Sequence, residues 1–164
     1  MDRDEKAMLL EQFNRAATYV DDLVAGKTTI AKAANIPRAE LDAMFEKGKM
    51  ALQLEDYDTA QGMFASLLFV NPKDMRSAMG LGGALEGLEQ YEMAVPVYFI
   101  VIATTLYDPV APFRSGMCLL KLGKKDEALK MFALAQACKG ENKDAAKQIY
   151  IQKAEGMIKV LMAE

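Results

Sequence analysis

The sequence predicts an all-α fold built from repeated helix pairs. Three stretches of the chain, 41–74, 75–108 and 109–142, match one another at a spacing of 34 residues without a gap. The matching positions hold small residues or rings: Gly48, Gly82 and Gly116; Ala60, Ala94 and Ala128; Phe64, Tyr98 and Phe132. A 34-residue period of this kind is typical of tetratricopeptide repeats (TPRs), each a pair of antiparallel helices. We therefore expect a TPR superhelix of three repeats.

The repeating positions have a physical explanation. Helices interdigitate well when small residues face large ones. In each repeat a glycine is expected on the first helix where it presses on the second, and an alanine on the facing helix. The ring one turn later is expected to fill the space toward the next repeat.

Residues 1–40 form an N-terminal segment before the repeats. Residues 3–25 have the apolar periodicity of an amphipathic helix, and Gly26 follows it as a glycine follows many helices. The connector that follows is expected to hold a short helix over Thr29 to Ala34, closed by Pro37. The apolar face of the first helix has no partner within its own helix, so we expect it to dock on the repeats or to form a homodimer. Its residues are Leu9, Phe13, Ala16 and Val20.

The helix pairs are expected at 41–70, 75–105 and 109–138. Asp74 is placed to cap the second repeat, and Asp108-Pro109 to open the third. Asn142 could cap a last helix within 143–164, which would cover the apolar end of the superhelix. Residues 93–106 are rich in β-branched residues and include Pro96, so alone they could form a buried strand; the period favours a helix with a distorted first turn.

Composition argues against several functions. The chain is 52% hydrophobic, carries a net charge of −3 and has no histidine. It lacks the basic character of most nucleic-acid-binding proteins and a run of 18 apolar residues that could cross a membrane. Cys118 and Cys138 lack metal-site spacing and are expected to be buried, inert thiols. We expect a cytosolic protein that is not an enzyme and needs no cofactor or metal.

Two short motifs are weak. The segment Gly26-Lys27-Thr28-Thr29 resembles the end of a phosphate-binding loop, but Asp21 stands where the first glycine is required. Residues 29–41 faintly resemble a helix-turn-helix, and their second helix carries too few basic residues to bind DNA phosphates.

The first helices of TPRs line an inner groove, and here the groove-facing positions are mostly apolar. This composition suits an extended peptide with aliphatic or proline anchors, unless another part of the chain covers the floor. The predicted partner-binding residues are Phe45, Lys49, Leu52, Arg76, Met79, Gly83, Phe113, Met117 and Leu120. A carboxylate clamp, the groove type that grips chaperone C-termini, is disfavoured because only Arg114 matches its pattern.

The chain resembles the class II chaperones of type III secretion, of the LcrH/SycD kind, over about residues 15–160. The resemblance rests on Gly26 to Ile30, on Ile36-Pro37 with 41–45, and on 79–84, 91–94, 108–113 and 116–120. It implies a small bacterial cytoplasmic chaperone, in many members a homodimer through the N-terminal region. Such chaperones bind hydrophobic translocator proteins in the groove and keep them soluble before secretion. The alternatives are a general TPR interaction scaffold and a DNA-binding regulator.

Overall fold

The computed structural model describes residues 11, 14, 17–105, 107–139 and 144–163, and these contain helices and turns but no strand. Residues 17–24 are helical. The further helices are α2 (Ile30–Ala33), α3 (Arg38–Gln53), α4 (Tyr57–Val70), α5 (Met75–Gly87), α6 (Tyr91–Thr104), α7 (Val110–Lys121), α8 (Lys125–Ala137) and α9 (Ala145–Ala163). The all-α prediction is confirmed.

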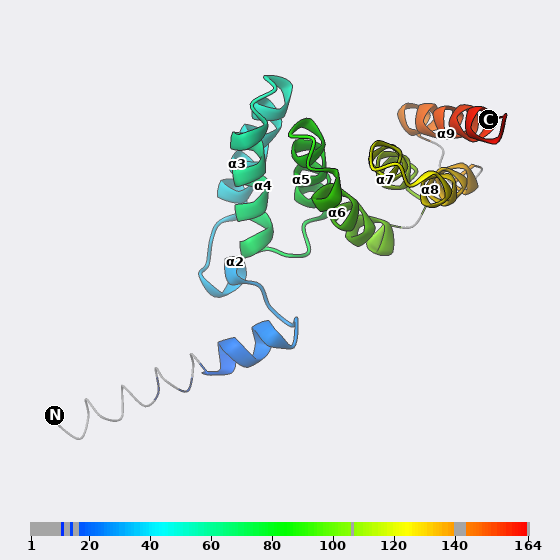
Figure 1. Cartoon of the computed structure of the whole chain (residues 1–164). Helices are drawn as coiled ribbons and strands as arrows, with labels where there is room; N and C mark the ends of the chain where they lie inside the picture. The colour runs from blue at the N-terminus through cyan, green and yellow to red at the C-terminus, as the bar shows by residue number, and fades with distance from the viewer. Residues whose placement is uncertain (1–10, 12–13, 15–16, 106, 140–143, 164) are drawn as a thin grey trace, which may run out of the picture.

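The helices stack in pairs along one superhelix (Figure 1). Each helix from α3 to α9 packs on its neighbour in the chain, so the pairs α3/α4, α5/α6 and α7/α8 form the three repeats and α9 covers α8. The predicted pairs are confirmed. The helix α3 begins at Arg38, earlier than expected, because Pro37 takes an extended conformation (φ −61°, ψ 139°) directly before it.

Aromatic rings of the second helices pack directly against glycines of the first helices; we call the space left by each missing side chain a notch. Phe64 is fully buried, and a Cβ placed on Gly48 would come within 2.9 Å of its Cζ atom. The same ring also lies against Gly80 of the next repeat, where a Cβ would be 2.5 Å from Cζ. Phe64 therefore joins two repeats, as the sequence predicts. The contact of Phe64 with Gly48 inside its own repeat has equivalents in the other two repeats, where Tyr98 lies against Gly82 and Phe132 against Gly116.

The turn inside each repeat has the same backbone conformation at the same register. Glu55 (φ 58°), Glu89 (φ 58°) and Gly123 (φ 73°) are 34 residues apart and all adopt the left-handed conformation. In the first repeat, Glu55 N–H donates to the Leu52 carbonyl and Asp56 N–H to the Ala51 carbonyl, which is the Schellman ending of a helix. Corresponding bonds end α5 and α7. The period thus fixes turns as well as helices.

Aspartates cap several helices as predicted. The Asp74 side chain accepts a hydrogen bond from the Arg76 N–H, and Asp108 accepts one from the Val110 N–H. Asn142, the predicted cap of the last helix, lies outside the described residues. Asp144 accepts a bond from the Ala146 N–H at the start of α9.

The segment with strand-like composition is the helix α6, and the strand alternative was wrong. The helix runs without interruption through Pro96, its sixth residue. Its inner face is held by Ala94, Tyr98 and Val101, which are almost fully buried. Tertiary packing at helical spacing therefore overrides the β-propensity of the segment.

Turns and one hydrogen bond fix the path of the chain between the first helix and the first repeat. Gly26 follows the first helix in the left-handed conformation (φ 65°), as predicted. The hydroxyl of Thr29 caps α2 by accepting from the Lys32 N–H, and Asn35 (φ 52°) ends that helix, two residues before Pro37. The Lys73 ammonium donates to the Gly26 carbonyl at 2.8 Å, which ties the connector to the first repeat.

Both cysteines are buried free thiols, as predicted. Burial, with the nearby charge of Glu86, raises the pKa of Cys118 to about 12, and burial also raises the pKa of Cys138. Neither is a reactive thiolate near neutral pH. In the part of the chain that the structure describes, no helix is long and apolar enough to cross a membrane, and no three acidic or cysteine side chains gather as metal ligands would.

Candidate peptide-binding groove

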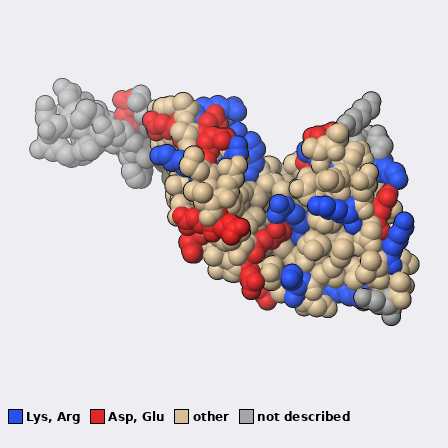
Figure 2. Space-filling view, turned by 90° about the horizontal axis from the view of Figure 1, so that it is seen from above, with Lys and Arg blue, Asp and Glu red and all other residues tan. Residues whose placement is uncertain are grey.

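The first helices of the repeats lie on the inner side of the superhelix. The helix α3 contacts α5, although α4 lies between them in the sequence. In the same way α7 contacts α9, although α8 lies between them. Seen from above, the outline of the molecule is indented between its N-terminal and C-terminal halves, and charged side chains border the indentation (Figure 2). The predicted groove residues all come from α3, α5 and α7.

The N-terminal part of the groove floor is the outer layer of the core. The Phe45 ring meets the buried Phe64 ring edge-on, with 5.7 Å between centroids. Phe45 and Leu52 are half-buried and pack on the core of the first repeat, and Met79 packs on the core of the second. A Cβ placed on Gly83 would meet only the Leu52 Cδ1 atom, at 3.9 Å. A ligand side chain therefore finds space above Gly83.

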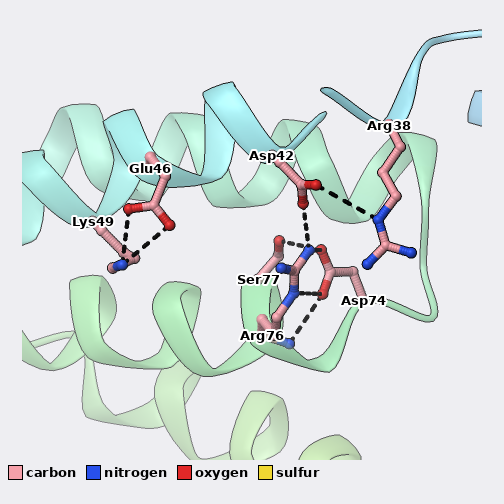
Figure 3. A network of polar contacts seen from close by, with 7 residues as sticks. All are labelled: Arg38, Asp42, Glu46, Lys49, Asp74, Arg76 and Ser77. Atoms are coloured by element: carbon pink, nitrogen blue, oxygen red, sulfur yellow. Dashed lines mark hydrogen bonds and ion pairs between the residues drawn. The ribbon is translucent and has the colours of Figure 1, made fainter. Parts of the chain in front are cut away.

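An ion-pair network forms the rim beside Phe45 (Figure 3). The Arg76 guanidinium bonds to Asp42 and to Asp74, each at 3.1 Å, and stacks over the Phe45 ring at 4.7 Å. Burial alone would raise the pKa of Asp74, but the bonds from Arg76 and Ser77 hold it below its usual value. The bonds that Arg76 donates to Asp74 and to Asp42 raise its own pKa. Both shifts favour the charged forms of Asp74 and Arg76.

Two further features complete this end of the groove. Lys49 pairs with Glu46 at 2.8 Å and lies 5.8 Å from the Phe45 ring centre. A hollow of about 340 Å³ opens between α2, the start of α3 and the loop before α5. Lys32 and Lys73 line it together with Arg76 and the two aspartates Asp42 and Asp74. With Arg38, the lining of the hollow carries more positive than negative side chains.

A polar contact crosses the middle of the groove, between α5 and α7. The Arg114 Nη1 atom donates to Glu86 Oε2 at 2.7 Å, and the Cys118 thiol donates to Glu86 Oε1 at 3.4 Å. Burial alone would lower the pKa of Arg114, but the neighbouring Tyr98 and Glu86 raise it, so the guanidinium stays charged. Arg114, which alone matched the carboxylate clamp, is thus already paired with an acid of the chain.

At the C-terminal end, α9 packs beside the predicted floor. The Phe113 ring lies 5.7 Å from Phe132 and 5.6 Å from Tyr150 of α9. Met117 and Leu120 are half-buried against the core that α8 and α9 share. The closing helix therefore covers part of this end. No motif in the sequence indicates that Tyr150 would meet Phe113, so this contact was not identified from the sequence.

The predicted dimerisation face is described at one residue only. Val20 is 57% exposed, as are Tyr19 (50%) and Val24 (85%) beside it on the same helix. Leu9, Phe13 and Ala16 lie outside the described residues. The described part of this helix carries apolar side chains that the body of the chain does not cover.

Several known proteins are similar to this chain in sequence and in fold. No protein-family model matches the chain. Low calcium response locus protein H of Yersinia pestis is 27% identical over 117 residues, which are 71% of this chain and 70% of that protein. PcrH of Pseudomonas aeruginosa, solved with the chaperone-binding region of PopD, is 26% identical with a TM-score of 0.74, over 78% of this chain and 95% of that one. The chain is therefore similar in sequence and in fold to chaperones of the LcrH/SycD family.

A third member of the LcrH/SycD family gives the same fold in a different assembly. The type III secretion translocator chaperone SycD of Yersinia enterocolitica, solved as an alternative dimer, is 25% identical with a TM-score of 0.72. The match covers 78% of this chain and 96% of that one. The family resemblance and the TPR-type fold inferred from the sequence are confirmed.

Proposed function

We propose that this protein is a bacterial cytoplasmic chaperone that binds hydrophobic translocators of type III secretion and keeps them soluble and competent for secretion. The observation that carries the proposal is the apolar groove of α3, α5 and α7 on the fold of PcrH, whose structure contains the chaperone-binding region of PopD. The described relatives are chaperones, and we infer that this chain too acts by binding rather than by catalysis.

Binding follows from the layout of the groove. An extended client segment would place aliphatic or proline side chains against Phe45, Leu52 and Met79 and above Gly83, where apolar surface leaves water at roughly 25 cal/mol per Å². Lys49 and Arg76 at the rim would bond to its backbone carbonyls. Phe113, Met117 and Leu120 would supply the other end of the floor. The aggregation-prone segment of the translocator would thereby be withdrawn from other apolar surfaces.

The test uses a translocator encoded beside the chaperone gene and its isolated binding segment. Phe45→Ala with Met79→Ala should weaken binding by about thirtyfold or more in isothermal titration, since truncating a central anchor can cost about 2 kcal/mol. Gly83→Phe should do the same by filling the open space. Gly62→Phe is the matched control, because Gly62 is exposed on α4 with no atom within 4 Å of its Cβ position.

Circular dichroism must show the same helix content in all variants. A folded Gly83→Phe variant that holds its client with wild-type affinity would overturn the proposal and move the binding site to the outer face or the N-terminal helix.

We further propose that the chain forms a homodimer through its N-terminal region, as the exposed Tyr19, Val20 and Val24 suggest. Removing residues 1–20 should shift the mass found by multi-angle light scattering from dimer toward monomer. An unchanged mass before and after the deletion would contradict this assignment.

A further inference from the structure

The groove floor is interrupted at its centre by a charged pair. Leu52, Glu86 and Leu120 occupy equivalent positions of the three repeats, so Glu86 stands where the other two first helices carry leucine. Its partner Arg114 comes from the next repeat, where the preceding repeat has Gly80. The repeat pattern alone would have produced a continuous apolar floor, and the pair divides it in two.

The pair is built into the groove rather than lying loosely on the surface. The side chain of Glu86 is 21% exposed and that of Arg114 is 38% exposed. Both Glu86 oxygens are engaged, one by Arg114 and one by the Cys118 thiol. A guanidinium carries five N–H donors, more than its bond to Glu86 uses, and carries no acceptor. The pair therefore offers donors to whatever lies over it.

A client segment bound over Arg114 would remove water from the N–H groups of its guanidinium. If an apolar side chain covered Arg114, its remaining N–H groups would lose water without gaining an acceptor, which is unfavourable. A side-chain amide or carboxylate at that place would replace the lost water. Donors of this kind discriminate strongly, because the wrong ligand leaves a buried polar group unpaired.

We infer that the middle of this groove selects client segments that carry a hydrogen-bond acceptor between two apolar anchors. One anchor lies on the Phe45 side and the other on the Met117 side, and the acceptor faces Arg114, which Glu86 holds in place. This inference rests on the proposed function and adds a specificity to it. Glu86 acts as a positioning residue for Arg114.

The test is a set of labelled 12-residue peptides of serine and glycine bearing two leucines, with three or five residues between them. The central residue is asparagine in one series and leucine in the other. Fluorescence anisotropy with the full chain should show at least tenfold tighter binding of the best asparagine peptide than of its leucine twin. The double variant Glu86→Leu with Arg114→Leu, which restores an apolar floor without leaving a lone charge, should reverse that order.

A control double variant removes an ion pair outside the groove. Lys139→Leu with Glu155→Leu deletes a 2.9 Å pair that links the residues just after α8 to α9. This variant should keep the wild-type preference for the asparagine peptide over its leucine twin. If the wild type and the Glu86→Leu, Arg114→Leu variant rank the asparagine and leucine peptides in the same order of affinity, the inference is overturned and the proposed function stands. Failure of both chains to bind any peptide with two leucines would overturn both.

Discussion

Substitution of Gly82 by alanine tests the packing that makes these repeats a superhelix. A Cβ on Gly82 would meet three ring carbons of Tyr98, with Cζ at 2.6 Å. Tyr98 is fully buried among Ala78, Leu85 and Ala94, so its ring cannot move aside. Overpacking of this kind typically destabilises a protein by about 1–3 kcal/mol.

Two other glycines separate this clash from the ordinary effect of the substitution. Gly62 in α4 and Gly156 in α9 have no atom within 4 Å of the Cβ position. Alanine there should stabilise the helix by roughly 0.5–1 kcal/mol, because glycine is the more flexible residue in the unfolded chain. The same change at Gly82 and at Gly62 should thus act in opposite directions and differ by about 1.5–4 kcal/mol, which corresponds to about 3–16 °C in Tm.

The measurement is urea denaturation followed by circular dichroism at 222 nm, with the variants compared by their midpoints. The loss at Gly82 should shrink when Tyr98 is replaced by leucine, because the clashing ring is then absent, and should persist with phenylalanine, which keeps those ring carbons. A Gly82→Ala protein at least as stable as the wild type would refute the notch as the source of the close packing.

Three further predictions concern single residues. Cys118, whose pKa is raised to about 12 by burial and by Glu86, should react with Ellman's reagent at pH 8 only after the chain is unfolded in urea; rapid labelling of the native protein would contradict its burial. Because bonds from Arg76 lower the pKa of Asp74 below 3.8, Asp74→Asn should lose stability, by about 1 kcal/mol, above that pH, and the difference from wild type in urea midpoint should vanish as pH falls through the native pKa. Glu89→Gly should stabilise and Gly123→Ala should destabilise the chain, each by about 1 kcal/mol, since both residues hold positive φ angles; equal midpoints would argue against the shared turn.

The fold was predictable because the signal is repeated. Any one of the segments around Gly48, Gly82 or Gly116 is ambiguous, and the sequence of α6 alone could also form a strand. Three copies in register fix the helix pairs, and the structure shows that the period extends to the left-handed turn residues Glu55 and Glu89. The start of α3 was displaced because capping at Pro37 is local and carries no repeat signal.

The candidate site was less predictable, because its decisive contacts break the repeat. Glu86 and Arg114 are 28 residues apart, and no spacing rule brings a residue of one repeat to an offset position in the next. Tyr150 of α9 contacts Phe113, and because Tyr150 lies beyond the third repeat, no repeated position predicts this contact. The period predicts the groove, and departures from the period give it its chemistry.

The edge-on packing of Phe45 against Phe64 bears on the entropy of association. A side chain that is loose before binding loses about 0.5–1.5 kcal/mol of rotational freedom when a partner immobilises it. Phe45, Leu52 and Met79 pack against the core of this structure, so in the proposed complex little of that loss would fall on this chain. The ordering cost of the proposed complex would instead fall on the client segment, whose flexibility and proline content would then determine its affinity alongside its anchors.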